Sequence, residues 1–197
     1  MSVVREITRA IRLILVLWVL TAIIYPLVMI GVGQVFFPFQ ANGSIMQNLQ
    51  GQDIGSALIG QVFTGEQYFQ SRPSTVGYSI GQGAAPTGIS GASNLAPSNP
   101  ELLKRIESQA QQLQEIGIQP TADLVYTSGS GLDPHITVDA ALAQVERVAT
   151  ARDLSTDDIT PLIAKYRQGR FLWIFGEPVV NVLRLNYALD VLQTPRE

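Results

Sequence analysis

The longest apolar stretch of the chain covers residues 13–37 and contains no charged residue. As a helix it would be about 37 Å long at 1.5 Å per residue, which exceeds a bilayer's ~30 Å hydrocarbon core. Only a helix lets a lone segment satisfy its own backbone hydrogen bonds in lipid. We therefore expect one transmembrane helix over residues 13–37, kinked near its middle, where Pro26 lacks a backbone donor.

The charges flanking this segment predict its orientation. Arg5, Arg9 and Arg12 precede it, whereas the next charged residue after it is Asp53. Since basic residues favour the cytoplasmic side, residues 1–12 are expected to be a cytoplasmic tail and residues 38–197 an extracytoplasmic domain, in a periplasm or its equivalent. A cleaved signal peptide is the alternative, but its apolar core would span only about 7–15 residues.

Beyond the anchor, the apolar positions alternate between helical and strand spacing, which predicts one α+β domain with a small sheet and packed helices. Helices are expected from Pro100 to near Gly117, over 138–152, from 156 to about 168, and over 187–192. Strands are expected over 58–63, 124–127, 171–175 and 179–185. The helical stripes predict these core residues: Leu102, Leu103, Ile106, Ala110, Leu113, Ala141, Leu142, Val145, Val148, Ala149, Ile159, Leu162, Ile163 and Tyr166.

Capping residues mark the helix starts. Ser98 or Asn99 precedes Pro100, Thr137 precedes the second helix, and the third begins at Ser155-Thr-Asp-Asp. The two adjacent aspartates, Asp157 and Asp158, would point about 100° apart on a helix, so they indicate a cap and not a cooperating pair of carboxylates.

A long segment over residues 68–100 is rich in Gly, Ser, Asn and Pro and predicts a loop. Loops of this length in compact domains are usually functional or disordered. Tyr68 and Phe69, close to Arg72, favour a loop pinned to another part of the molecule or to a partner. A mobile linker is the alternative.

Composition excludes several classes of function. The chain has no cysteine and a single histidine, His135, which leaves no disulfide, thiol nucleophile or multi-histidine metal site. Residues 1–12 carry three Arg against Glu6, a net charge of +2. The rest of the chain therefore carries −5, which gives the total of −3. Without a basic stripe, nucleic-acid binding is not expected.

The glycine-rich loop over residues 128–136 is the most suggestive stretch for chemistry. It lacks the lysine of a phosphate-binding P-loop. Ser130, Asp133 and His135 are triad residue types, yet three residues within one tight loop rarely converge as a triad must. A structural or partner-contacting loop is expected, with ligand contact and catalysis as weaker alternatives. Arg147, Arg152 and Arg170 are dispersed in sequence and are expected on the solvated surface.

Six blocks together indicate a family: FPFQANGS, GSALIGQVFTGEQYFQSRPS, SGASNLAPSNPEL, SGSGLDPHIT, QVERVATARDLS and GEPVVNVLRLNYALD. Over essentially its full length, the chain resembles the C subunit of the Kdp potassium-transporting P-type ATPase. The resemblance implies a non-catalytic subunit of an inner-membrane complex with channel-forming (A), ATP-hydrolysing (B) and small (F) subunits. The chain has neither an Asp-Lys-Thr-Gly-Thr motif nor a Walker A motif, in agreement with this role.

For that family a catalytic-chaperone role has been proposed, in which the subunit raises the pump subunit's affinity for ATP. The resemblance places the associated nucleotide contact at Gln144, and it implies that K+ is transported by the complex and not bound by this chain. ATP is cytoplasmic, however, whereas the arginine bias places Gln144 outside. We therefore expect the domain mainly to hold the complex together and to shape potassium entry.

Two functional classes remain open. An accessory subunit would contact its partners through Pro26 and through loop residues, for which the candidates are Tyr68, Phe69, Arg72, Ser130, Asp133 and His135. A free-standing anchored module would instead bind a nucleotide or an anion at residues 128–137. The sequence favours the accessory subunit.

Overall fold

The structure is a computed structural model that describes residues 3–79 and 88–193. It divides into two compact units, residues 1–45 and 46–197, which are considered separately below.

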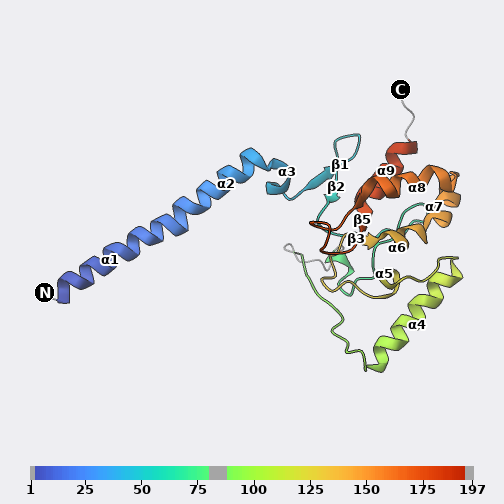
Figure 1. Cartoon of the computed structure of the whole chain (residues 1–197), viewed down its shortest axis with the longest axis horizontal. Coiled ribbons are helices and arrows are strands. Elements are labelled where there is room, and N and C mark those ends of the chain that lie inside the picture. Colours follow the sequence, from blue (N-terminus) through green and yellow to red (C-terminus); the bar gives the residue numbers. More distant parts are fainter. Residues whose placement is uncertain (1–2, 80–87, 194–197) are drawn as a thin grey trace. The chain divides into compact units, whose positions relative to one another are not determined.

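The first unit is one long apolar helix followed by a short one. The long helix comprises α1 (Val3–Val19), the π-helical turn η1 (Leu20–Ile24) and α2 (Tyr25–Phe36), and α3 (Pro38–Ala41) follows it (Figure 1). Over Val3–Phe36 the helix is long and apolar enough to cross a membrane, with a mean hydropathy of 2.7 in its most apolar window. It begins ten residues before the predicted segment and ends one residue before residue 37.

Pro26 lies at the start of α2, and the helix runs through it as one rod (Figure 1). The backbone N–H of Tyr25 bonds to the carbonyl of Leu20, five residues earlier. This wider turn makes room for a proline ring, which in a regular helix would clash with the carbonyl four residues before it. The predicted kink is therefore wrong, and the local change at Pro26 is a π-helical turn.

The second unit contains two small antiparallel arrangements of strands. A hairpin pairs β1 (Ile45–Gln47) with β2 (Asp53–Ser56). The other sheet has the order β3-β5-β4, formed by His135–Thr137, Val179–Asn181 and Arg167–Gln168. Val180 lies opposite both Ile136 and Arg167, so β5 is the central strand, as its β-branched sequence predicts.

Helices pack around this sheet and confirm the α+β class (Figure 1). They are α4 (Pro100–Glu115), α5 (Ala122–Val125), α6 (Val138–Leu142), α7 (Val145–Arg152), α8 (Thr156–Tyr166) and α9 (Val182–Gln193). Helix α8 contacts α7, α9 and β5. The fully buried centre includes Phe69, Ile118, Ile136, Val148, Ile159, Ile163, Val180, Leu185 and Leu189.

Three predicted strands are wrong. Residues 58–63 form a turn and irregular chain, residues 122–125 are the helix α5, and residues 171–175 form a tight turn. The fourth strand ends at Asn181, because the side-chain oxygen of Asn181 accepts from the N–H of Arg184 and starts α9 there. The helix predicted over residues 187–192 is therefore longer and starts at Val182.

Helix caps follow the sequence closely. Asn99, not Ser98, caps α4 by accepting from the N–H of Glu101. Thr137 caps α6 through the N–H of Ala140. Ser155 and Asp158 form the reciprocal capping box of α8, and its hydrogen bonds from Ser155 lower the pKa of Asp158.

Two residues predicted for the core lie at the surface. The exposed fraction is 59% for Leu103 and 44% for Leu142. Leu103 lies on the outer side of α4, whose face buries Leu113. Leu142 lies at the end of α6, where the predicted helix over 138–152 is interrupted.

The long loop is pinned over much of its described length, while residues 80–87 of that prediction lie outside the described residues. The N–H of Ser128 bonds to the carbonyl of Pro73, and the hydroxyl of Ser74 donates to the carbonyl of Gly131. Gly131 has a φ of +71°, and a Cβ there would lie 2.6 Å from the carbonyl oxygen of Gly91. A glycine is required at this contact for both reasons.

Candidate functional site

Gln144, the residue of the predicted ATP contact, lies between α6 and α7 and is fully buried. Its side-chain oxygen accepts from the N–H of Gln70 at 2.7 Å and from Arg147 at 3.0 Å. Its side-chain nitrogen donates to the carbonyls of Gln70 at 3.2 Å and Ala140 at 3.1 Å. A carboxamide has two donors and two acceptor positions, so the hydrogen-bonding capacity of Gln144 is filled within the chain.

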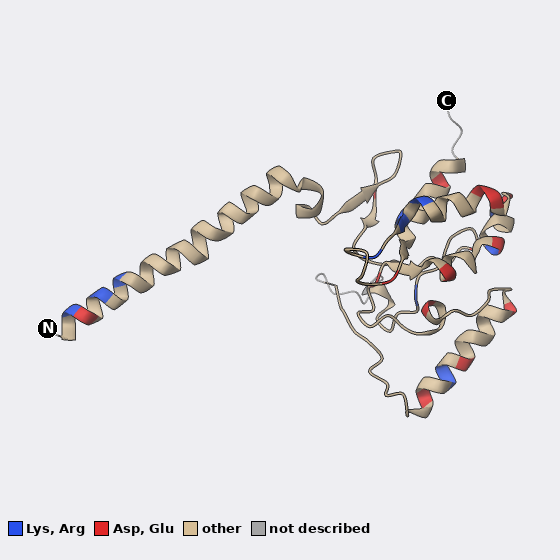
Figure 2. Cartoon of the chain, in the orientation of Figure 1, with Lys and Arg blue, Asp and Glu red and all other residues tan. Residues whose placement is uncertain are grey.

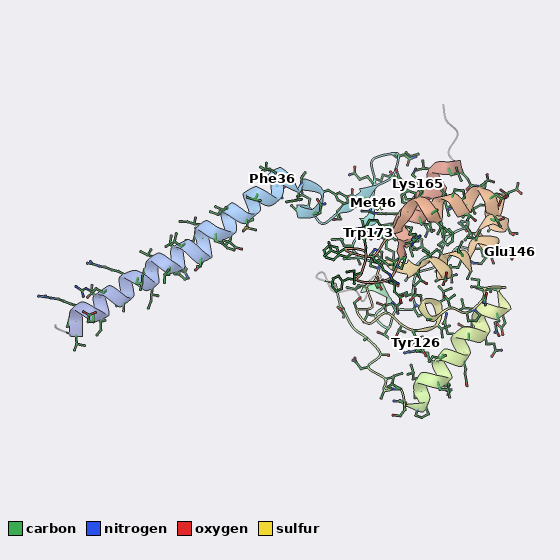
Figure 3. All side chains as sticks on the ribbon, in the orientation of Figure 1. Phe36, Met46, Tyr126, Glu146, Lys165 and Trp173 are labelled. Carbon is green, nitrogen blue, oxygen red and sulfur yellow. The ribbon has the colours of Figure 1, made fainter. Side chains whose placement is uncertain are left out.

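The same contacts interrupt the predicted helix. In a continuous helix the backbone N–H of Gln144 would bond to the carbonyl of Ala140. Here the side chain of Gln144 takes that carbonyl, and its backbone N–H bonds to Ala141 instead. Glu146, two residues further along, lies at the surface of α7 (Figure 3).

Asn186 on α9 bonds to the backbone of Phe69 in the same way that Gln144 bonds to the backbone of Gln70. Its side-chain oxygen accepts from the N–H of Phe69 at 2.8 Å, and its nitrogen donates to the carbonyl of Phe69 at 3.0 Å. Asn186 is 2% exposed. Two buried amides thus replace the neighbouring strand that would otherwise pair with the backbone of Phe69 and Gln70.

Residues 66–70 form a segment that we call the strap. Two arginines of α7 donate hydrogen bonds to its other backbone carbonyls. Arg147 donates to the carbonyls of Glu66 and Tyr68. Arg152 donates to the carbonyl of Gln67 at 2.6 Å. Burial lowers the pKa of Arg147, and the charge of Glu66 opposes that shift. The prediction that Arg147 and Arg152 are solvated is therefore wrong, because both guanidinium groups complete the hydrogen bonding of the strap.

Arg152 also ties the strap to α9. Its guanidinium pairs with Asp190 at 2.8 Å and donates to Gln193 at 2.7 Å. It lies 4.9 Å from the centre of the Tyr68 ring, a cation–π contact. Tyr68 is half-buried, whereas Phe69 is fully buried in the core and does not reach the surface.

The glycine-rich loop forms a second polar cluster around Arg72. The guanidinium of Arg72 lies 3.4 Å from the carboxylate of Asp133 and 3.6 Å from that of Asp123. Asp133 accepts from the backbone N–H of His135 at 3.0 Å, and its carboxylate lies 3.4 Å from the His135 ring. Asp123 accepts from the N–H of Thr137 at 2.6 Å. This cluster joins the long loop to α5 and β3.

Electrostatics in this cluster favour an ionised Asp133. Burial raises the pKa of Asp133, but hydrogen bonds from His135 and the positive charge of Arg72 lower it by more, so the net pKa lies below 3.8. Burial raises the pKa of the neighbouring Tyr78 to about 12, and its hydroxyl donates to the carbonyl of Arg72. Tyr78 therefore acts as a neutral donor near neutral pH.

The triad residue types do not converge. Ser130 lies 3.3 Å from Ser128 and accepts from the N–H of Leu132, while the Asp133 carboxylate faces His135 and Arg72. Ser128 is fully buried and accepts from the N–H of Gly131. These hydroxyls shape the loop from within. Among residues 3–79 and 88–193, no group of three acidic or histidine side chains could hold a metal ion.

Asn186 and Asp123 were not identified from the sequence. Asn186 stands among the apolar residues of α9, and a lone amide in a buried stripe requires a hydrogen-bond partner. That position could have drawn attention to Asn186, but not to its partner in the strap, more than a hundred residues earlier.

Comparison with known proteins decides the family. Residues 7–191 match the family described as "K+-transporting ATPase, c chain". The chain belongs to the KdpC family. It is 66% identical over 191 residues to the potassium-transporting ATPase KdpC subunit of Anabaena sp. (strain L31), covering 97% of this chain and 96% of the relative.

More distant relatives carry the same description. Identity is 59% over 187 residues to the KdpC subunit of Synechocystis sp. (strain ATCC 27184 / PCC 6803 / Kazusa), covering 95% of this chain and 98% of the relative. It is 44% over 193 residues to that of Geobacter sulfurreducens (strain ATCC 51573 / DSM 12127 / PCA), with coverage of 95% and 98%. As a KdpC chain it is an accessory subunit of the K+-transporting ATPase, not the catalytic one.

Proposed function

We propose that this chain anchors an extracytoplasmic domain to the inner membrane, where the domain holds together the channel-forming, ATP-hydrolysing and small subunits of a high-affinity potassium uptake complex. The observation that carries this proposal is the family match over residues 7–191, which includes both the apolar helix and the domain. K+ is the cargo of the complex.

The sidedness rests on the distribution of charge. Arg5, Arg9 and Arg12 lie near the start of α1, and no charged residue follows until Asp53 (Figure 2). The test uses the absence of cysteine: Ser2→Cys and Ser108→Cys are made separately, the second on the exposed side of α4. In intact cells, a membrane-impermeant maleimide should label Ser108→Cys and not Ser2→Cys. The reverse pattern would overturn the orientation.

A catalytic-chaperone role, if the domain lies outside, has to act through neighbouring subunits, because ATP is on the other side of the membrane. The filled hydrogen bonds of Gln144 support this indirect route, since a nucleotide contact would require the strap to leave. Direct contact between Gln144 and ATP stays a prediction of the family resemblance.

Gln144 and Asn186 form a matched pair that separates the two routes. Gln144→Ala and Asn186→Ala each remove one of the two buried side-chain amides that bond to the backbone of the strap. Only Gln144 is a candidate for ATP contact. The measurement is the KM for ATP of the purified complex carrying each variant. Equal effects of the two variants are expected for the indirect route. A several-fold rise in KM for Gln144→Ala alone would support direct contact.

Assembly is tested separately at Arg72, whose side chain is 25% exposed. Arg72→Ala leaves Asp123 and Asp133 without their cation and should loosen the loop, so less of the other subunits should be recovered with a tagged chain. Lys104→Ala on α4 is the control. Unchanged recovery and potassium uptake would remove Arg72 from the partner contacts. ATP binding by the full chain without partners would favour an anchored ligand-binding module instead.

A further inference from the structure

Residues 171–175, which we call the apolar tip, expose five consecutive large apolar side chains. The exposed fractions are 72% for Phe171, 63% for Leu172, 93% for Trp173, 72% for Ile174 and 62% for Phe175. Figure 3 labels Trp173 on this turn. Single exposed apolar residues are ordinary on a protein surface, but a contiguous group such as this usually marks a contact with a membrane or another protein.

The apolar tip has a defined conformation. The backbone groups of Phe171 and Phe175 bond to each other in both directions, at 2.8 and 2.9 Å. Leu172 and Trp173 have φ values of +50° and +66°, in the left-handed region that bulky residues rarely adopt. The two hydrogen bonds hold this turn closed, so the aromatic and aliphatic side chains are presented outward together.

Basic residues accompany the apolar tip. Lys165, Arg167 and Arg170 precede it and Glu177 follows, so residues 165–177 carry a net +2, three positive charges against one negative. All four are exposed. Residues 46–197 as a whole carry −5, ten basic against fifteen acidic residues, which makes this a local positive patch. Anionic lipid headgroups attract such patches over about a Debye length.

The chain length keeps the domain near the bilayer. Residues 37–45 connect the end of α2 to the second unit. Fully extended, they would span at most about 32 Å, and the helical α3 shortens them. A tether of this length gives the domain a high effective concentration at the bilayer surface, so a weak affinity for that surface is enough for contact.

We propose that the apolar tip inserts into the headgroup region of the bilayer on the domain's side, with Arg167 and Arg170 binding anionic phospholipid headgroups. Trp and Phe suit this region because their large rings partition into the boundary between headgroups and acyl chains. The occupant is a lipid surface and not a protein, because exposed cations flank the tip and only a short connecting segment separates the domain from the apolar helix.

The test uses tryptophan fluorescence, since the chain contains only Trp18 and Trp173. The full chain carrying Trp18→Phe is reconstituted into vesicles of phosphatidylcholine and phosphatidylglycerol in equal parts, with or without bromine on the acyl chains. Trp173 should emit at a shorter wavelength than in water and be quenched by the bromines several-fold more strongly than by aqueous iodide. Emission typical of water with strong iodide quenching would overturn the proposal.

A matched control places a tryptophan on another exposed apolar position. Leu103→Trp on α4, in a chain with both native tryptophans changed to Phe, should show aqueous emission and little bromine quenching. Equal bromine quenching at both positions would show only that the domain lies near lipid, and it would overturn the specific insertion of the apolar tip. Arg167→Gln with Arg170→Gln should lower the bromine quenching of Trp173 several-fold, and unchanged quenching would remove the headgroup contact.

A final measurement distinguishes lipid from protein. In the complete complex, Trp173 shielded from both bromine and iodide would place the apolar tip against another subunit and overturn lipid insertion. Strong bromine quenching in the complex would support it. Neither outcome depends on the catalytic-chaperone role or on the KM for ATP.

Discussion

At the scale of single residues, buried polar side chains determine where the chain can run. Gln144 and Asn186 each bond both backbone groups of one residue in the strap. An unpaired buried donor costs about 1–3 kcal/mol, so these amides fix the strap more firmly than apolar packing alone would. Their types can be read from the sequence, but their partners are distant along the chain.

Asp133 provides a prediction for pH dependence. Its pKa is lower in the folded chain than its ordinary 3.8, so its stabilising effect is present above pH 3.8 and is lost as the pH falls below 3.8 through the folded-state pKa. Asp133→Asn should therefore lower the urea midpoint near neutral pH, and its difference from the wild type should shrink at acidic pH. Circular dichroism in detergent solution follows the unfolding.

Glu107→Gln, an exposed acid on α4, is the control for the loss of one negative charge. Its urea midpoint should stay close to that of the wild type near neutral pH. If the difference between Asp133→Asn and the wild type is the same at neutral and acidic pH, the ionised carboxylate is not the source of the stabilisation.

At the scale of elements, the predicted helix caps are confirmed, whereas three of the four predicted strands are wrong and only the strand that begins at Val179 is formed. Thr137 and Ser155 start helices where the sequence predicts, because a cap depends on residues within one turn. Residues 58–63 have apolar and β-branched side chains, but they belong to neither sheet formed by residues 3–79 and 88–193. Strand propensity reflects fit to a neighbouring strand, which the local sequence does not supply.

The capping box of α8 can be tested alone. Ser155→Ala removes the hydroxyl that accepts from the first turn and should destabilise the domain by about 1 kcal/mol. Hydrogen exchange should accelerate in the first turn of α8. Thr156→Ala is the matched control, since Thr156 is exposed and contributes its backbone carbonyl to Thr160. Equal exchange in the two variants would contradict the role of Ser155.

At the scale of the whole molecule, composition separates an anchor from a domain. The basic residues of the first twelve positions are exposed on α1, and Arg9 pairs with Glu6 at 2.9 Å. The charge asymmetry across the apolar helix is the physical basis for orientation. The asymmetry predicts an extracytoplasmic domain, which would be separated from cytoplasmic ATP by the membrane.

Replacing Arg5, Arg9 and Arg12 with Gln should weaken this preference. In a chain that carries Ser108→Cys, labelling of intact cells should become incomplete, because part of the population inserts in the opposite orientation. Glu6→Gln removes an acid from the same tail and should leave the labelling complete. Complete labelling of the triple variant would mean that partners or the folded domain determine the orientation.

The sequence by itself determined the apolar helix, the α+β class, the central position of β5, the helix caps and, through six ordered blocks, the family. These features depend on composition, on the spacing of residues within one element or on continuous sequence motifs. Only the tertiary structure decided that Gln144 interrupts a helix to hold the strap, that Arg147 and Arg152 are partly or wholly buried, and that residues 171–175 are an exposed turn. Each of these depends on a contact, or on the absence of one, between segments far apart in the chain, and periodicity carries no information about such pairs.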